Sequence, residues 1–223
     1  MLFSSIPFLY YFLPSVLILY FLAPKKFKNT VLLLSSLVFY GWGEPKYLIL
    51  MVASIVIGYF SGLLIEATNE KSKKKLILTL NVAVNLGFLG FFKYSDFFIE
   101  NFNNLTGLSV SLLNIALPIG ISFYTFQILS YTVDVFRGDV KAQKNLINLA
   151  TYITMFPQLI AGPIVRYTDV VQSLANRTIN FEKISYGLRR FIVGLSKKVL
   201  LANALGELCV TFKASDDKSL LFY

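Results

Sequence analysis

The sequence predicts an all-α protein, a polytopic transmembrane helical protein with short, broken or re-entrant helices. Of its 223 residues, 56% are hydrophobic and 15% are charged, whereas soluble domains have roughly 45–50% apolar and about 25% charged residues. The apolar residues form long runs, and short clusters of Lys and Arg separate these runs. This arrangement is typical of a chain whose solvent is lipid, and it excludes a soluble globular domain.

The first half of the chain holds three apolar runs that predict complete spans. Ile6–Leu22 is followed at once by basic residues and has no basic segment before it, which favours an uncleaved first helix with its N-terminus outside. Tyr47–Ile65 and Leu76–Phe92 are the next two spans. Thr30–Tyr40 is apolar but is too short to cross alone by the rule of about 20 residues.

Small residues form a stripe on the predicted helix 47–65. Ser54, Gly58, Ser61 and Gly62 lie at positions i, i+4, i+7 and i+8, so they share one face. Such a stripe lets another helix approach closely. Packing within the protein is the expected use, and docking of a partner protein is the alternative.

The second half of the chain has broken apolar segments. Ile115–Phe136 contains Pro118 and Gly120 near its start, and Leu146–Ala161 ends at Gly162-Pro163. Gly and Pro interrupt helices, and backbone groups freed at membrane depth must be buried in protein or line a wet cavity. A re-entrant segment around Gly162-Pro163 and a full crossing both remain open.

Residues 184–199 have apolar side chains at helical spacing, with Lys and Arg between them. This pattern predicts a basic amphipathic interfacial helix, or a span that enters the membrane obliquely.

Basic residues also predict the topology. The loops 24–29, 66–75 and 137–145 are basic, which places them in the cytoplasm by the positive-inside rule. The loops 41–46 and 93–107 then lie outside. Beyond residue 145 the rule assigns no side. The net charge of +9 is explained by these loops, and we expect no nucleic-acid interface because no basic patch is interleaved with stacking aromatics.

One polar stripe is the candidate path-lining site. Gln127, Ser130, Tyr131 and Asp134 lie at i, i+3, i+4 and i+7, on one helical face. A carboxylate in a membrane helix faces a cavity or other helices. The stripe is therefore either the lining of a substrate path or a hydrogen-bond network between helices. We expect Arg166 to pair with a carboxylate, with Asp134 as the candidate, or to anchor at the interface.

No complete catalytic or metal-binding set is found in the sequence. There is no His, hence no His general base and no Ser-His-Asp triad. Cys209 has no second cysteine to pair with, Asp216-Asp217 is interpreted as a solvated pair, and no nucleotide-binding glycine motif occurs. We therefore expect no catalytic, metal-binding or cofactor-binding residue in these 223 positions.

Several motifs are similar to those of a known family. Met1-Leu-Phe-Ser-Ser5, Phe39-Tyr-Gly-Trp-Gly-Glu-Pro45, Leu117-Pro-Ile-Gly-Ile-Ser-Phe-Tyr-Thr-Phe-Gln127 and Phe156-Pro-Gln-Leu-Ile-Ala-Gly-Pro-Ile-Val-Arg-Tyr167 resemble the membrane-bound O-acyltransferase superfamily, and within it the bacterial alginate O-acetylation group. A fifth motif, Tyr131-Thr-Val-Asp-Val-Phe-Arg-Gly138, lies between the last two. The motif residues Pro157, Gln158, Gly162, Pro163 and Arg166 join the polar stripe as candidate site residues.

The resemblance implies a function. Family members are polytopic proteins about twice as long, which pass an acyl group from a cytoplasmic donor, such as acetyl-CoA, across the membrane. In this group the acceptor is an exported polysaccharide, and extracytoplasmic acetylation proteins are partners. Relatives that D-alanylate teichoic acid share the fold. We therefore expect a multi-pass protein of the bacterial plasma (inner) membrane, in contact with lipid.

The family's histidine lies in its C-terminal half, so the resemblance identifies residues 1–223 as a single membrane domain, the N-terminal portion of a larger acyltransferase. Without a histidine we expect no acyltransferase activity from this chain alone. Two hypotheses of other classes remain open. One is a transporter or channel subunit, supported by the polar stripe and the broken helices, and the other is a non-catalytic membrane scaffold.

Overall fold

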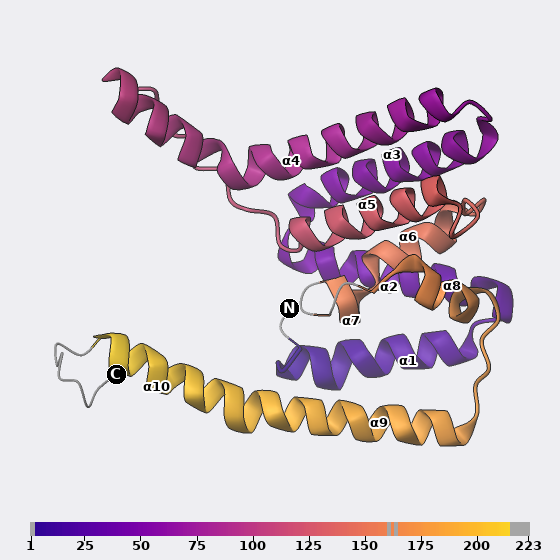
Figure 1. The fold of residues 1–223 in the computed structure, drawn as a ribbon. Helices are drawn as coiled ribbons and strands as arrows, with labels where there is room; N and C mark the ends of the chain where they lie inside the picture. Colours follow the sequence, from indigo (N-terminus) through magenta and orange to yellow (C-terminus); the bar gives the residue numbers. More distant parts are fainter. Residues whose placement is uncertain (1–2, 160–161, 163–164, 215–223) are drawn as a thin grey trace. The chain divides into compact units, whose positions relative to one another are not determined.

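The computed structural model describes residues 3–159, 162 and 165–214, and within these ranges the secondary structure is helical with no strand. The all-α prediction is confirmed. The α-helices are α1 (Leu13–Leu22), α2 (Lys28–Gly43), α3 (Leu48–Ala67), α4 (Lys71–Thr106), α5 (Ile121–Arg137), α6 (Leu146–Thr154), α7 (Phe156–Leu159), α8 (Tyr167–Ala175), α9 (Phe181–Ser196) and α10 (Asn203–Ala214). Two π-helical segments, η1 (Pro7–Phe12) and η4 (Lys197–Ala202), and two 3₁₀ turns, η2 (Lys25–Phe27) and η3 (Pro45–Tyr47), complete the order (Figure 1).

The chain divides into two compact units by its contacts. Unit 1 is essentially Ser15–Asn176, and unit 2 joins Leu2–Pro14 with Arg177–Tyr223. Two helical segments of unit 1, Pro45–Ala67 and Lys71–Thr106, are long and apolar enough to cross a membrane. Pro7–Leu22 is a shorter apolar helix.

The centre of unit 1 is formed by α3, α4 and α5. A Cβ added to Gly58 of α3 would lie 2.6 Å from Cγ2 of Ile128 on α5, and one added to Gly62 would lie 2.7 Å from the Tyr131 hydroxyl. The small-residue stripe therefore serves contact within the chain, as the packing interpretation predicts. Its Gly58 and Gly62 positions are occupied by α5 and offer no free surface to a partner.

A polar contact joins α4 to α5 close to the part of α5 that packs on Gly58 and Gly62. Asn81 Nδ2 donates to Thr132 Oγ1 at 3.0 Å, and Asn85 Nδ2 donates to the backbone and side-chain oxygens of Asn81 at 2.9 and 3.0 Å. Both asparagines are buried, because an amide in lipid must find its partner inside the protein.

Contacts between loops define two ends of unit 1. At one end, Glu66 and Tyr59 of α3 hydrogen bond to the loop 138–145 after α5. We call this the basic end, because it carries the clusters 71–75 and 137–144. At the opposite end, the Glu44 carboxylate accepts from the Ile119 amide at 2.8 Å, and the Tyr47 and Phe92 rings pack edge to face at 5.6 Å. The loop 138–145 therefore lies at the basic end and Glu44 at the opposite end, while the sides of the membrane on which they lie stay a prediction.

Two expected boundaries were wrong. The predicted loop at Lys93–Gly107 is helical up to Thr106, because no Gly or Pro interrupts the chain before Gly107, whose left-handed φ of 73° ends α4. The apolar run 146–161 is not one helix: α6 ends at Thr154. The ring of Pro157 would meet the carbonyl of Ile153 in a continuous helix, and Pro157 has no N–H to donate.

Unit 2 contains one nearly continuous helical run, α9, η4 and α10. From Phe181 to Lys213 none of its side chains is buried. The predicted helix is thus present and amphipathic in sequence, while its location at a membrane interface stays a prediction.

Candidate functional site

One face of α5 meets the segment that follows α6. Gly120, at the N-cap of α5, and Asp134 near its other end lie two heptads apart, with Gln127 midway, so the three share a face. A Cβ at Gly120 would lie 3.1 Å from the Leu159 carbonyl oxygen, and φ at Gly120 is 75°. At the other end, Asp134 pairs with Arg166. The start of α5 therefore contacts the end of α7, and the end of α5 contacts Arg166.

These contacts show that the chain turns back after α7. We call α6, α7 and residues Val165–Arg166 the returning segment. It begins after Asn145 at the basic end, reaches the start of α5 at Leu159, and is back beside Asp134 at Arg166. The Tyr152 hydroxyl of α6 donates to the Val165 carbonyl at 2.7 Å, which ties the outgoing and incoming parts together. The returning segment therefore starts and finishes at the same end of unit 1.

Local polar contacts explain where this segment bends. The Asn145 side chain caps α6 by accepting from the amides of Ile147 at 2.9 Å and Asn148 at 3.4 Å. Where the helix breaks before Pro157, the freed amide of Phe156 donates to the Ser36 hydroxyl of α2 at 3.2 Å. A buried amide at a helix end needs such a partner, so Ser36 fixes the position of α7.

Gly162 makes the closest backbone approach in this region. Its amide donates to the Gln158 carbonyl at 3.1 Å. A Cβ at Gly162 would lie 2.7 Å from the Gln158 Cα and 2.9 Å from its carbonyl oxygen, and backbone atoms cannot rotate away as a side chain can. The site thus requires glycine at this position. The predicted site residue Pro163 lies outside the described residues.

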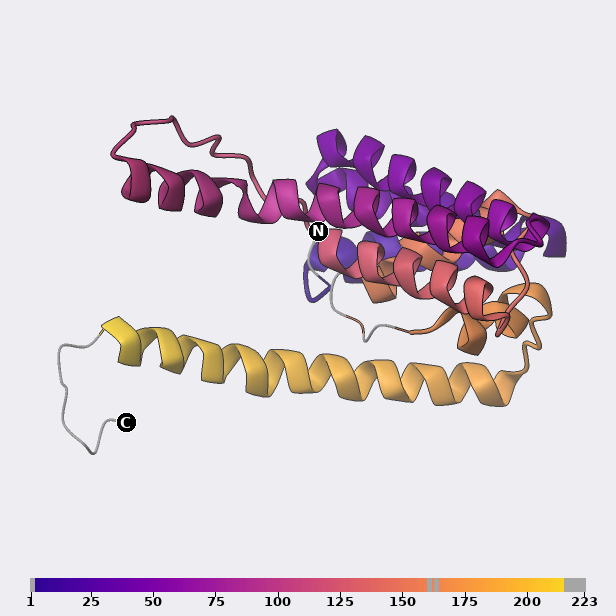
Figure 2. The same cartoon turned by 45° about the horizontal axis from the view of Figure 1, so that its top comes forward.

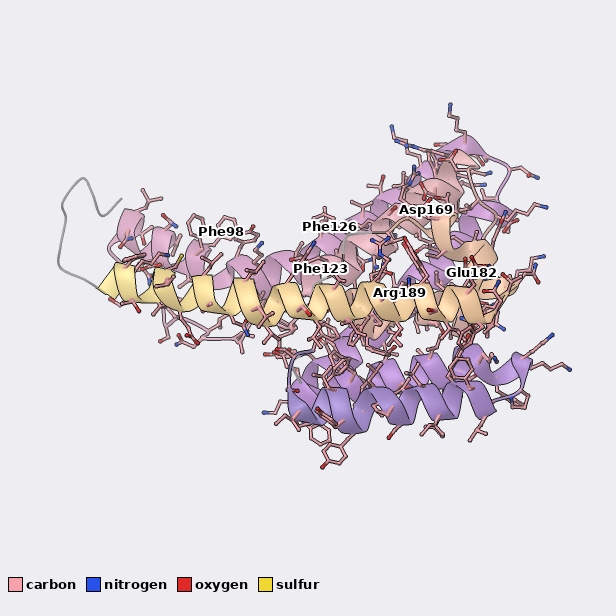
Figure 3. All side chains as sticks on the ribbon, turned by 90° about the horizontal axis from the view of Figure 1, so that it is seen from below. Phe98, Phe123, Phe126, Asp169, Glu182 and Arg189 are labelled. Carbon is pink, nitrogen blue, oxygen red and sulfur yellow. The ribbon has the colours of Figure 1, made fainter. Side chains whose placement is uncertain are left out.

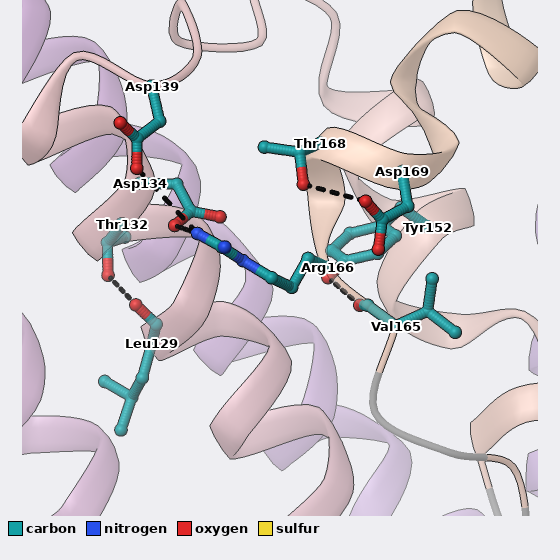
Figure 4. A network of polar contacts seen from close by, with 9 residues as sticks. All are labelled: Leu129, Thr132, Asp134, Asp139, Tyr152, Val165, Arg166, Thr168 and Asp169. Carbon is teal, nitrogen blue, oxygen red and sulfur yellow. Dashed lines mark hydrogen bonds and ion pairs between the residues drawn. The ribbon is translucent and has the colours of Figure 1, made fainter.

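Arg166 forms the predicted ion pair. Its Nη2 donates to Asp134 Oδ1 and lies 3.8 Å from Asp139 Oδ2 (Figure 4). The Asp134 side chain is 2% exposed and that of Arg166 is 50% exposed. The hydrogen bond and the charge of Asp134 raise the pKa of Arg166 further above its ordinary value. The pairing with Asp134 is confirmed, and the guanidinium keeps one side toward the surface.

The loop 138–145 is held by hydrogen bonds from three helices. Glu66 Oε2 of α3 accepts from the Ala142 amide at 2.9 Å, and the Tyr131 hydroxyl of α5 accepts from the Gln143 amide at 2.9 Å. The Gln143 side chain donates to the Tyr167 hydroxyl of α8 at 2.7 Å. A cavity of about 570 Å³ lies here. It is lined by Glu66, Val140, Lys141, Ala142, Gln143, Lys144, Tyr167 and Val171.

Several buried polar atoms have no hydrogen-bond partner among the described residues. On the α5 face and the returning segment they are Gln127 Oε1, Asp134 Oδ2 and Gln158 Nε2. Tyr124 of α5 and Tyr40 of α2 add two hydroxyls. Buried polar side-chain atoms are nearly always hydrogen bonded, directly or through water. We therefore take this set as the candidate contact region for water or a polar ligand.

The remaining predicted residues lie close by but differ in their surroundings. Ser130 is half-buried, and Pro157 is exposed. Tyr131 turns toward Gly62 of α3 as well as toward the loop, so the predicted stripe of α5 serves two different contacts. Sequence reasoning missed Gln143 and Glu66. Glu66 could have been found as a carboxylate at the end of an apolar run, whereas Gln143 carries no sequence signal.

The arrangement combines one ion pair with several neutral polar groups. The Asp134 carboxylate is already paired, and within residues 3–159, 162 and 165–214 no three His, Cys, Asp or Glu side chains gather as a metal site would need. The site offers amide and hydroxyl groups, one buried carboxylate and one arginine. These groups can bind and orient a polar molecule.

Comparison with known proteins finds relatives whose names all describe O-acetylation. The chain is 42% identical over 213 residues to the "Probable alginate O-acetylase AlgI" of Azotobacter vinelandii, covering 93% of this chain and 43% of that protein. It is 42% identical to the protein of the same name from Pseudomonas aeruginosa, with 93% and 41% covered. It is 34% identical to the "Peptidoglycan O-acetyltransferase" of Helicobacter pylori, with 91% and 45% covered.

The chain spans less than half the length of these relatives. No solved structure matches it significantly. The family model described as MBOAT, membrane-bound O-acyltransferase family, matches residues 86–221, which include α5, the returning segment and the Asp134–Arg166 pair. The chain therefore belongs to the membrane-bound O-acyltransferase family.

Proposed function

We propose that this chain forms the N-terminal portion of an O-acetyltransferase that acts on an exported polysaccharide. In this proposal the acetyl group comes from a cytoplasmic donor, with acetyl-CoA as the candidate, and crosses the bacterial inner membrane along α5. The names of the relatives support O-acetylation of alginate or peptidoglycan as the reaction class. The histidine of the family motif is supplied by sequence beyond these 223 residues, so the chain alone is expected to be inactive.

The observation that carries the proposal is the polar face of α5 opposite the returning segment. Gln127 and Asp134 are buried at 1% and 2% exposure, and each has one oxygen without a partner among the described residues. Such groups are costly in an apolar interior. They are explained if a polar molecule moves past them during the reaction cycle.

The proposed topology puts the basic end in the cytoplasm, by the positive-inside rule. The returning segment then enters the membrane from the cytoplasm and goes back to it, as a re-entrant element. This topology agrees with the polar contacts of Arg166, because an arginine at the basic end keeps one side in water.

Sidedness can be tested by single-cysteine labelling in a Cys209→Ser background. Cysteines at Lys73 and at Lys46, in the loop 41–46, should react from opposite sides of the membrane, with Lys73 cytoplasmic. A cysteine at Arg177, just after α8, should react from the same side as Lys73. Reaction of the Lys73 and Lys46 cysteines from one side would reject the topology.

The function is tested in the full-length protein, in cells that lack their own polysaccharide acetylase. Gln127→Leu keeps the size of the side chain but removes both of its polar groups, so acetylation should fall strongly while the protein is still inserted. The matched control is Phe126→Leu, because Phe126 is 45% exposed on a different face of α5 and should leave acetylation unchanged. Full acetylation by Gln127→Leu at normal protein level would reject the path along α5.

A further inference from the structure

The distal half of α4 extends beyond the helices that surround its first half. α4 runs for 36 residues, which is about 54 Å at the rise of an α-helix. Its last buried side chain is Leu89, and Phe92 still packs on Tyr47. From Lys93 to Thr106 the helix projects from unit 1, and the chain then comes back along it to Ile119 (Figures 1 and 2). We call residues 93–119 the arm.

The polar side chains of the arm are used to satisfy its own backbone. Asn103 accepts from the Val110 amide at 2.9 Å and donates to the Val110 carbonyl at 2.8 Å. The two oxygens of Asp96 accept from the amides of Leu113 at 2.8 Å and Asn114 at 3.1 Å. Residues 107–119 form no helix, and these bonds satisfy some of the backbone groups that a helix would have paired. Water is therefore not needed at these backbone groups.

The outer surface of the arm is apolar and aromatic. Its sequence contains three charged residues, Lys93, Asp96 and Glu100, and Asp96 is occupied by the backbone amides. Phe98 lies on the projecting part of α4, well away from Phe123 and Phe126 near the start of α5 (Figure 3). The exposed apolar side chains of the arm are Phe97, Phe98, Phe102, Leu105, Leu108, Val110, Leu112, Leu113, Leu117 and Ile119.

A hollow in this surface is also lined mainly by apolar side chains. Its volume is about 530 Å³, and Phe98, Phe102, Leu105 and Val110 supply most of its lining. The apolar surface is continuous with the apolar side of α4, which is itself a candidate membrane span. Lipid accepts irregular backbone only where protein groups satisfy the polar atoms, and the bonds of Asn103 and Asp96 meet this condition for Val110, Leu113 and Asn114.

We propose that the arm lies in the bilayer leaflet opposite the basic end, with its aromatic surface among phospholipid acyl chains and its polar groups at the headgroup level. Phe and Leu side chains insert favourably into the hydrocarbon region, and the hollow is filled by part of an acyl chain. This inference rests on the proposed membrane topology of the chain. It does not depend on the proposed chemistry, so the acetylation assay and the lipid experiment below fail independently.

The test uses the chain in nanodiscs of phosphatidylcholine and phosphatidylglycerol at one chain per disc, in the Cys209→Ser background. A fluorescent probe is attached to Phe98→Cys on the arm or to Lys73→Cys at the basic end. The quenchers are a phospholipid that carries its spin label on the acyl chain, and iodide in water. The arm probe should be quenched several-fold more by the spin-labelled lipid than the Lys73 probe, and iodide should show the reverse order.

Asn103→Ala and Asn101→Ala form a matched pair for the role of the internal bonds. Asn101 lines the same hollow but donates to the Phe97 carbonyl of its own helix, whereas Asn103 bonds both backbone groups of Val110. Asn103→Ala should raise iodide quenching of the Phe98 probe, and Asn101→Ala should not. Iodide access to the arm of the unaltered chain, protection of the arm from both quenchers, or equal behaviour of the two variants would each overturn the proposal.

Discussion

α5 packs against α3 on one face and against the returning segment on another, and the two contacts use different chemistry. Toward α3, Gly58 receives the Ile128 side chain and Gly62 receives Tyr131, so the contact is close and its fit is steric. Toward the returning segment, Gly120 and Asp134 make contacts at the two ends, and the Gln127 oxygen between them has no partner among the described residues. The first face is built for stability, whereas the second is held at its ends and keeps polar groups available between them.

The largest loss of acetylation is expected from a change at Gly162, which lies after α7 and affects only the face of α5 toward the returning segment. In the full-length protein, Gly162→Leu should abolish polysaccharide acetylation while the protein still inserts, because the new Cβ would lie 2.7 Å from the backbone of Gln158. Gly87→Leu on α4 is the control, since a Cβ there meets no atom of the described residues within 4 Å. Acetyl content of the secreted polymer and protein level are measured together. Normal acetylation by Gly162→Leu would show that the turn is outside the working site.

The stability of the α3 face is tested by Gly58→Ala. The new methyl group would crowd Ile128 Cγ2 at 2.6 Å, and such overpacking costs about 1–3 kcal/mol. Thermal unfolding of the chain in detergent should show this loss, and Gly90→Ala, with nothing of the described chain within 4 Å, should not. Equal stability of the two variants would mean that α3 and α5 are not in close contact.

The end contact of the other face is tested by a double-mutant cycle on Asp134 and Arg166. Asp134→Asn, Arg166→Ala and the double variant should have non-additive effects on thermal unfolding, as expected for residues in direct contact. Arg166→Ala should also impair acetylation in the full-length protein without loss of the helices. Asp139 lies 3.8 Å from the guanidinium and is 46% exposed, so Asp139→Asn should show a smaller coupling to Arg166 than Asp134→Asn does. A larger coupling for Asp139 than for Asp134 would contradict the geometry.

The smallest effect is expected where the two faces meet, at Tyr131. Tyr131→Phe removes the acceptor of the Gln143 amide but keeps the ring against Gly62. The loss should be about 0.5–1.5 kcal/mol, the usual net value of a hydrogen bond. Hydrogen exchange of the Gln143 amide should become faster, while that of the Ala142 amide, held by Glu66, should change less. Unchanged exchange at Gln143 would remove Tyr131 from the support of this loop.

The sequence predicts one contact on each face of α5. The stripe of Gly58 and Gly62 and the pairing of Asp134 with Arg166 follow from helical spacing and from the scarcity of buried charges, because both are decided by local pattern. The bend at Met155 and the helix through Lys93–Thr106 were not predicted. Each depends on a partner distant in sequence or on the absence of a helix breaker, such as Ser36 for the Phe156 amide, and periodicity does not report such contacts.

The return of the chain to the basic end has a consequence for counting membrane crossings. A segment that comes back to the side where it began does not change whether the number of membrane crossings is odd or even. Its apolar run 146–161 nevertheless resembles a span in a hydropathy plot. In the proposed topology, α8 and the loop 138–145 share a side, and the bond between Tyr167 and Gln143 ties them together there. Any topology that counts residues 146–166 as one crossing inverts the side assigned to every later segment.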